Sequence, residues 1–192
     1  MSSRGKWLIG LTALAVVLSI GIWQSWPQDA DDSLPSPEQQ AEQLKGAPPR
    51  LAALHAQAGE LIEGDIEGRL RQLRGTPVVV NMWASWCGPC RAELPVLGRV
   101  AVAEGKRVAF LGLNSKDKSR KKAEELLAEF PQSYPSYVDE DHSQARKLGF
   151  LSNFPSTAFV DARGEVAYLH QGQYVSEADL QADIAKYLRG AQ

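Results

Sequence analysis

Cysteine and histidine are scarce in this sequence, which has only Cys87, Cys90 and three scattered histidines among its 192 residues. Two cysteines cannot form a framework of several disulfides, and they are too few for a cysteine-rich zinc site. The scattered histidines likewise predict no metal site. Basic charge is not in excess either, because 21 Lys and Arg residues stand against 23 Asp and Glu residues. Nucleic-acid binding needs a basic face, so no nucleic acid is expected as a partner.

Hydrophobic residues make up 44% of the chain, which is enough to build a core and excludes wholesale disorder. The length allows one ordinary domain with appendages. We therefore expect a folded domain preceded or followed by segments of different character.

A long apolar run, WLIGLTALAVVLSIGIW, covers residues 7–23 near the N-terminus. We predict a transmembrane signal anchor over residues 7–26, because about 20 apolar helical residues span a bilayer. Arg4 and Lys6 precede the run, so residues 1–6 are expected in the cytoplasm and the rest of the chain in the periplasm or on the outer face of the membrane. The alternative is a cleaved signal peptide, although no clear small-x-small cleavage site follows the run.

The composition changes after this apolar run. Residues 27–49 are rich in proline, acidic residues and glutamine and poor in apolar residues, which predicts a flexible linker. The folded domain is then expected over residues 50–192. Lys and Arg balance Asp and Glu in that range at 18 each, so its net charge gives no clue to a partner.

Hydrophobic patterns within residues 50–192 predict an α/β domain. Short β-branched or apolar runs indicate buried strands, and apolar residues three or four positions apart indicate helices. Two short runs that flank Ala162-Arg163-Gly164 indicate a β-hairpin. The predicted strands cover residues 77–83, 107–113, 137–138, 156–161 and 165–170. The predicted helices cover residues 51–58, 66–73, 91–103, 118–130, 143–148 and 176–188.

The two cysteines occur in the run Trp86-Cys87-Gly88-Pro89-Cys90, directly after a predicted strand and at the start of a predicted helix. At this spacing they lie near enough to form a disulfide. Cys87 would sit at the helix N-terminus, where unpaired backbone N–H groups and the helix dipole favour the thiolate, which is the nucleophile. Cys90 lies one turn inside the helix and is suited to be the resolving thiol. Half of a zinc site would need two further ligands, and inert core thiols would not explain this placement, so we predict dithiol redox chemistry.

The run NMWASWCGPCRAELPVL resembles the active site of thioredoxin, and more closely that of the membrane-anchored TlpA/ResA/DsbE-like branch. The resemblance covers residues 75–188 and includes the run NFPSTAFVDARGEV and an extra αβ unit at residues 115–138. It implies a thioredoxin fold, in which helices flank a central mixed sheet, with an extra αβ insertion and a preceding N-terminal transmembrane helix.

The resemblance also implies roles for residues outside the cysteine pair. Pro155 matches the family's cis-proline, which packs opposite the cysteines, and it leaves the Phe154 backbone free to pair with an extended substrate chain. Phe154 is bulkier than the residue usual in the family, so no substrate preference is carried over. Glu93 matches a carboxylate of the ResA-like branch and would accept the proton of Cys90; the alternative is a solvated helix side chain. Asn81 stands where thioredoxin has a buried Asp.

Aromatic and histidine side chains near these motifs are assigned from the pattern alone. Trp86 is predicted to be exposed beside Cys87, whereas Trp83 is expected in the core. His142 and His170 have no partner nearby in the sequence and are predicted to be surface residues.

We therefore expect a membrane-tethered thiol–disulfide oxidoreductase that reduces disulfides of exported proteins through Cys87 and Cys90, with no metal or organic cofactor. The Gly88-Pro89 dipeptide matches that of thioredoxin and favours a reductant. By resemblance, electrons come from a membrane dithiol carrier, and the client is apocytochrome c or another oxidised exported protein. Three alternatives stay open, namely a disulfide donor for secreted proteins, a thiol peroxidase and a non-catalytic binding module.

Overall fold

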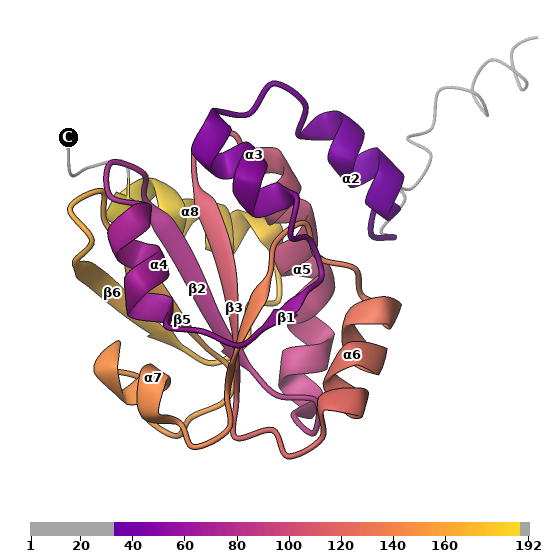
Figure 1. The fold of residues 1–192 in the computed structure, drawn as a ribbon, viewed down its shortest axis with the longest axis vertical. Coiled ribbons are helices and arrows are strands. Elements are labelled where there is room, and N and C mark those ends of the chain that lie inside the picture. Colours follow the sequence, from indigo (N-terminus) through magenta and orange to yellow (C-terminus); the bar gives the residue numbers. More distant parts are fainter. Residues whose placement is uncertain (1–32, 189–192) are drawn as a thin grey trace, which may run out of the picture. The chain divides into compact units, whose positions relative to one another are not determined.

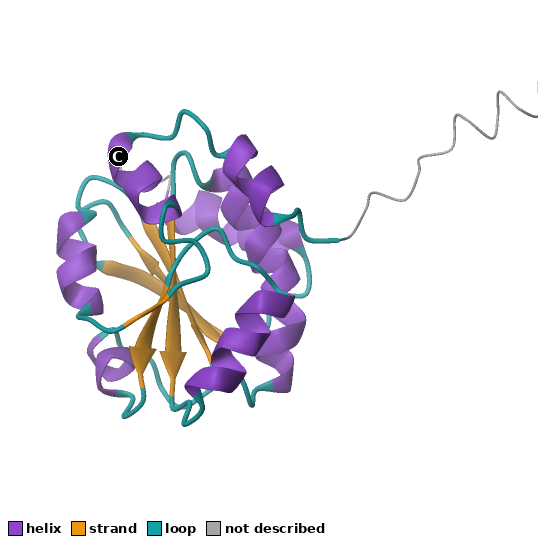
Figure 2. Ribbon diagram, turned by 45° about the vertical axis from the view of Figure 1, so that its right-hand side comes forward, coloured by secondary structure: helices purple, strands orange, loops and turns teal. Residues whose placement is uncertain are grey.

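One six-stranded sheet organises the structure, a computed structural model that describes residues 33–188. Helices cover both faces of the sheet (Figures 1 and 2). The strands are β1 (Leu61–Ile62), β2 (Val78–Trp83), β3 (Ala109–Ser115), β4 (Ser136–Asp139), β5 (Ser156–Val160) and β6 (Val166–Gln171). The helices are α2 (Pro37–Gln43), α3 (Pro49–His55), α4 (Ile66–Gln72), α5 (Gly88–Glu104), α6 (Arg120–Glu129), α7 (Ser143–Lys147) and α8 (Glu177–Leu188).

The strands run in the order β1-β4-β3-β2-β5-β6. The first four in this order are parallel neighbours, whereas β5 pairs antiparallel with both β2 and β6. This mixed sheet with helices on both faces confirms the predicted thioredoxin-like α/β fold, including the hairpin of β5 and β6 and the extra unit of α6 and β4. Strand β1 was not predicted, because its two residues are too few to show a periodic pattern.

Alternation along β2 divides the core between the two faces of the sheet, since successive side chains of a strand point to opposite faces. Val79 and Trp83 pack in one cluster with residues of α5, α6 and α8. Val78, Val80 and Met82 pack in the other cluster with residues of α3, α4 and α7. Both faces are apolar, which explains why this run contains almost no polar residue.

The segment before α3 packs against the domain instead of extending away from it. The Leu34 side chain fills the space that a Cβ on Gly98 of α5 would need, and Leu44 does the same at Gly105. Between them, the Gln40 amide donates a 2.9 Å hydrogen bond to the Pro131 carbonyl. Residues 34–44, which were predicted to belong to a flexible linker, are thus packed against the domain. They pack there because Leu34 fits against Gly98 of α5 and Leu44 fits against Gly105, the C-cap of that helix.

The predicted membrane anchor at residues 7–26 lies outside the described residues. Within residues 33–188, no helix is both long enough and apolar enough to cross a bilayer.

Candidate functional site

Four loops meet at one edge of the sheet. Parallel strands β2 and β3 both end there, and the loops that follow them carry Cys87 and Asp117. Strand β5 runs the opposite way, so the loop that precedes it, with Pro155, lies at the same edge. Strand β6 ends there too, and Tyr174 lies in the segment that follows it. The topology thus brings together residues up to about 90 positions apart in the sequence.

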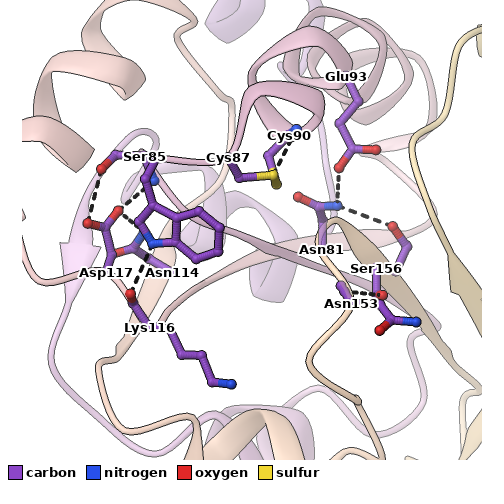
Figure 3. The surroundings of a disulfide bond; sticks show 12 residues. Asn81, Ser85, Cys87, Cys90, Glu93, Asn114, Lys116, Asp117, Asn153 and Ser156 are labelled. Carbon is purple, nitrogen blue, oxygen red and sulfur yellow. Dashed lines mark hydrogen bonds between the residues drawn. A yellow bond between two sulfur atoms is a disulfide. The ribbon is translucent and has the colours of Figure 1, made fainter.

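Cys87 and Cys90 form a disulfide, with their Cα atoms 5.3 Å apart. Cys87 is the N-cap of α5, and its Sγ accepts a 3.1 Å hydrogen bond from the backbone N–H of Cys90 (Figure 3). Cys87 retains 4% of its accessible surface, whereas Cys90 is fully buried. The geometry places an N–H donor and the positive end of a 17-residue helix at the Cys87 sulfur. Both are features that favour a thiolate once the disulfide is reduced.

An aromatic contact joins the loop before the cysteine pair to the loop that carries Pro155. The rings of Trp86 and Phe154 lie 5.0 Å apart between centroids, and the Trp86 indole N–H donates to the Lys116 carbonyl at 3.0 Å. The Phe154–Pro155 peptide bond is cis, the conformation that the resemblance implied. Trp86 is exposed and Trp83 is buried, as predicted.

Glu93 is fully buried on the side of α5 that faces the sheet. Its Oε1 accepts a 2.7 Å hydrogen bond from the Asn81 side-chain amide, and its Oε2 accepts a 3.1 Å bond from the Tyr174 backbone N–H (Figure 3 shows Asn81 and Glu93). Burial raises the pKa of Glu93 to about 7, although both hydrogen bonds oppose that rise. A carboxyl with this pKa exchanges its proton near neutral pH, whereas a solvated glutamate would stay ionised.

Asp117 fixes the loop between β2 and Cys87. Its carboxylate accepts hydrogen bonds from the Ser85 N–H at 2.5 Å, the Ser85 hydroxyl at 3.0 Å, the Asn114 amide at 3.1 Å and the Ser119 N–H at 3.2 Å (Figure 3 shows the first three). Burial on its own would raise the pKa of Asp117, but these donors hold it below its ordinary value. The sequence analysis did not identify this residue, which lies 30 positions from Cys87.

The prediction that His142 is a surface residue is wrong. His142 is 3% exposed, and its Nδ1 lies 2.8 Å from the Ser115 hydroxyl, which donates to Asp139 at 2.9 Å. His170 is half-buried, and its ring stacks on that of Tyr174 with the centroids 4.1 Å apart. The partner of His142 lies on β3, 27 positions away, so nothing in the local pattern signalled the burial of His142.

The structure brings together the residues that the sequence singled out. Cys87, Cys90 and Glu93 share the first turns of α5, and Trp86 meets Phe154 beside them. The site also contains residues that the sequence analysis missed, namely Ser85, Asn114, Lys116, Asp117 and Tyr174. Their only sequence signal was a place directly after a predicted strand, which is where residues of open α/β sheets approach ligands.

Comparisons with known proteins agree with this geometry. The Redoxin family model matches residues 56–184. The thiol:disulfide interchange protein DsbE of Pseudomonas fluorescens biotype C is 40% identical over 106 residues, which cover 55% of this chain and 57% of that protein. DsbE of Xylella fastidiosa strain 9a5c is 29% identical over 166 residues, covering 86% of this chain and 76% of that protein. This chain therefore spans little more than half of the first relative and about three quarters of the second.

A solved structure shares the fold over part of this chain. The structure of a putative DsbE from Chlorobium tepidum superposes with a TM-score of 0.56 and 26% identity, over 62% of this chain and 84% of that one. The predicted resemblance to DsbE-like thioredoxin-fold oxidoreductases is confirmed by sequence and structure together.

Proposed function

The chain belongs to the Redoxin family and has the fold and the cysteine pair of the DsbE-like thiol–disulfide oxidoreductases, and from this premise we propose that it reduces disulfides of exported proteins. The observation that carries the proposal is the place of Cys87 at the N-cap of α5, with its sulfur against the Cys90 N–H. In the reduced protein this place stabilises a thiolate, so Cys87 is the nucleophile. Cys90, fully buried one turn later, is the resolving cysteine.

The reaction is two successive thiol–disulfide exchanges. The Cys87 thiolate attacks one sulfur of the substrate disulfide, a mixed disulfide forms, and the other substrate sulfur leaves as a thiolate. Cys90 then loses its proton and attacks the Cys87 sulfur, which forms the Cys87–Cys90 disulfide and releases the second substrate thiolate. Two electrons thus pass from the dithiol to the substrate, whose thiolates take up protons.

Glu93 is placed to accept the proton of Cys90. The two residues are three positions apart on α5, so their side chains lie on the same side of the helix. With a pKa raised by burial to about 7, the carboxylate can take a proton near neutral pH and return it later. No metal or organic cofactor has a role in this sequence of steps.

Exposed apolar side chains on the loops that meet at the site are the substrate surface that we propose. Trp86 is 58% exposed, Leu151 is 61% exposed and Val175 is 74% exposed, although large apolar residues are usually covered. These three come from three of the loops that meet at the site. We assign to them the binding of apolar side chains next to the substrate cysteine.

The backbone at Phe154 is the second element of substrate binding. Pro155 has no N–H, and strand pairing between β5 and β6 begins only at Ser156. The Phe154 N–H and carbonyl make no hydrogen bond within the described part of the chain. An extended substrate segment can therefore pair with this backbone beside Cys87, by strand addition to the edge of the loop.

We further assign residues 7–26 as the membrane anchor that holds the domain on the extracytoplasmic side. The apolar run and the preceding Arg4 and Lys6 support this assignment. A membrane dithiol carrier then re-reduces the Cys87–Cys90 disulfide, and apocytochrome c is the client we propose. Extraction of host membranes with alkaline carbonate tests the anchor, because only an integral protein stays with the lipid.

The reaction is tested by its redox potential and by trapping. Equilibration with glutathione buffers should give a potential near the value of thioredoxin, about -270 mV, while a value near -120 mV would instead indicate a disulfide donor. Cys90→Ser should accumulate a mixed disulfide with the client in host membranes, and Cys87→Ser, the matched control, should capture none. Equal capture by both variants would contradict the assigned nucleophile.

A further inference from the structure

The Tyr174 backbone belongs to none of the elements that carry the cysteines, yet its N–H donates to Glu93 Oε2 at 3.1 Å. It lies 81 positions after Glu93, in the segment between β6 and α8. The Asn81 side-chain amide donates a hydrogen bond to the other carboxylate oxygen, Oε1. The surroundings of Glu93 therefore depend on where this segment is held.

The Tyr174 side chain is held from both sides. Its hydroxyl donates a 2.6 Å hydrogen bond to Asp183 of α8, and its ring stacks at 4.1 Å and 21° on His170 of β6. His170 Nδ1 lies 3.6 Å from the same Asp183 oxygen, Oδ2, which closes the cluster. Tyr174 is 2% exposed, so its side chain has one tightly packed position. The start of the segment is also tied down, because the Gly172 N–H donates to the Pro155 carbonyl at 2.9 Å.

We propose that Tyr174, His170 and Asp183 form a positioning cluster that holds the Tyr174 amide against the carboxylate of Glu93 and so controls the second step of the exchange. The inference rests on the proposed function, in which Glu93 accepts the proton of Cys90. None of the three residues needs to touch a reacting sulfur. They act through the amide, so they are positioning residues.

The groups that face Glu93 show why the hydrogen bond from the Tyr174 amide affects the ionisation of Glu93. Asn81 of β2 is neutral. Tyr134, a buried residue just before β4, has its pKa raised by burial and by Glu93. Tyr174 stays neutral as well, since burial and Asp183 raise its pKa. No cation pairs with Glu93 in the described part of the chain, so the hydrogen bonds from Asn81 and Tyr174 are what stabilise its ionised form.

A two-stage release of thionitrobenzoate separates the steps of the reaction. When the reduced full-length protein reacts with dithiobis(nitrobenzoate), Cys87 attack releases the first thionitrobenzoate and Cys90 attack releases the second. The pH profile of the second release reports the proton acceptor of Cys90. Cys90→Ser must release only the first, and a second release from that variant would overturn the proposed function itself.

Tyr174→Phe removes the hydroxyl that anchors the segment. We expect the midpoint of the second release to move to higher pH by about half a unit or more, because a weaker amide bond raises the pKa of Glu93. Tyr187→Phe is the matched control, since it removes a tyrosine hydroxyl from α8, the helix that carries Asp183, at a place where the ring stacks on Tyr168 and not on His170. This control should leave the midpoint unchanged.

A double variant shows whether the effect passes through Glu93. Glu93→Gln should flatten the pH profile, and adding Tyr174→Phe to it should cause no further shift. Asp183→Ala provides a second disruption of the cluster, and circular dichroism checks that each variant is folded. The positioning role would be overturned if the midpoint stayed unchanged or moved to lower pH in both cluster variants. It would also be overturned if the shift persisted in the Glu93→Gln background. Neither result would contradict the exchange reaction itself.

Discussion

The side-chain amide of Asn81 donates a 2.7 Å hydrogen bond to the carboxylate of Glu93, and both residues are buried. The donor stands on β2 and the acceptor on α5, so the contact joins the central strand to the helix of the cysteine pair. Because Asn81 cannot ionise, this buried pair holds a single titratable group. The proton that Glu93 gains or loses is therefore not shared with a second carboxyl, and its effects can be measured separately.

The first prediction concerns stability and Glu93. Burial raises its pKa from 4.5 to about 7, so the folded protein binds this proton more tightly than the unfolded chain. The contribution of this group to stability is therefore greatest below pH 4.5 and decreases by about 3 kcal/mol in total as the pH rises through 7. The side chain in Glu93→Gln stays neutral at every pH. The free energy of unfolding of this variant, relative to the wild type, should therefore increase by about 3 kcal/mol between pH 4 and pH 8.

Urea unfolding of the oxidised protein at pH 4, 6 and 8 measures this difference. The substitution also removes one acceptor oxygen, which costs about 1 kcal/mol at every pH and leaves the slope unaffected. Glu60→Gln removes an exposed carboxylate and is the control, with no expected change in slope. Parallel curves for the wild type and Glu93→Gln would contradict the buried titration.

The second prediction concerns Asp117 and the loop before Cys87. Asp117→Asn replaces an acceptor of four hydrogen bonds by a group that cannot accept them all, so unfolding at pH 7 should become easier by about 2 kcal/mol. The pKa of Asp117 lies below its ordinary value, so its stabilisation is present above pH 3.8 and is lost as the pH falls through the lowered value. Wild type and variant should thus converge in strong acid.

Asp141→Asn is the matched control for that experiment. Asp141 is an exposed carboxylate whose pKa is lowered by hydrogen bonds from Ser143, but it lies in the loop before α7. Its substitution should change stability by less than about 0.5 kcal/mol. If both variants lose the same stability, the network around Ser85 is not what holds the loop.

The third prediction compares two glycines. A Cβ on Gly112 of β3 would lie 2.0 Å from Ser136 Oγ and 2.9 Å from Trp83 Nε1, which hydrogen-bond to each other across this glycine. Gly112→Ala should therefore cost about 3 kcal/mol or more, because a packed sheet must move apart. A Cβ on Gly88 would meet nothing within 4 Å, and Gly88→Ala should stay within about 1 kcal/mol of the wild type. Urea unfolding measures the loss of stability in both variants. Equal losses of stability would contradict the close packing at Gly112.

Local signals were sufficient for most elements of the fold. The run at residues 77–83 is mostly apolar and β-branched, which predicted a buried strand, and the cysteines that follow it marked a helix start, which the structure places at Gly88. Strand β1 (Leu61–Ile62) was not predicted, because two residues are too few to show a periodic pattern. The docked α2 was missed because its fit depends on Gly98 and Gly105, more than 50 positions away.

From the residue pattern alone, the site was predictable where its residues are neighbours in the sequence. Pro155 and Phe154, which meet the cysteines by topology, were named only through the family resemblance. Cys87, Cys90 and Glu93 lie within seven residues of one another at the start of α5. Spacing and helix physics identified the two cysteines, and the family resemblance identified Glu93. The donors around Glu93 come from β2 and from beyond β6, and only the folded sheet brings them there. His142 was placed at the surface because its partner, Ser115, lies 27 positions away.

The last prediction concerns substrate choice at Phe154. Its ring lies 5.0 Å from that of Trp86, so the two can hold an apolar side chain beside Cys87, and an aromatic contact of this kind contributes about 0.5–1.5 kcal/mol. We expect the wild type to reduce a glutathionylated peptide with phenylalanine next to its cysteine at a lower KM than the same peptide with serine there. Phe154→Ala should lose this preference, with a rise in KM of up to about tenfold for the phenylalanine peptide only. Val166→Ala removes an exposed apolar side chain from the end of β6 that pairs with Val160, far from Ser156, and should keep the preference. A preference retained in Phe154→Ala would mean that the aromatic pair packs the loop and does not select the substrate.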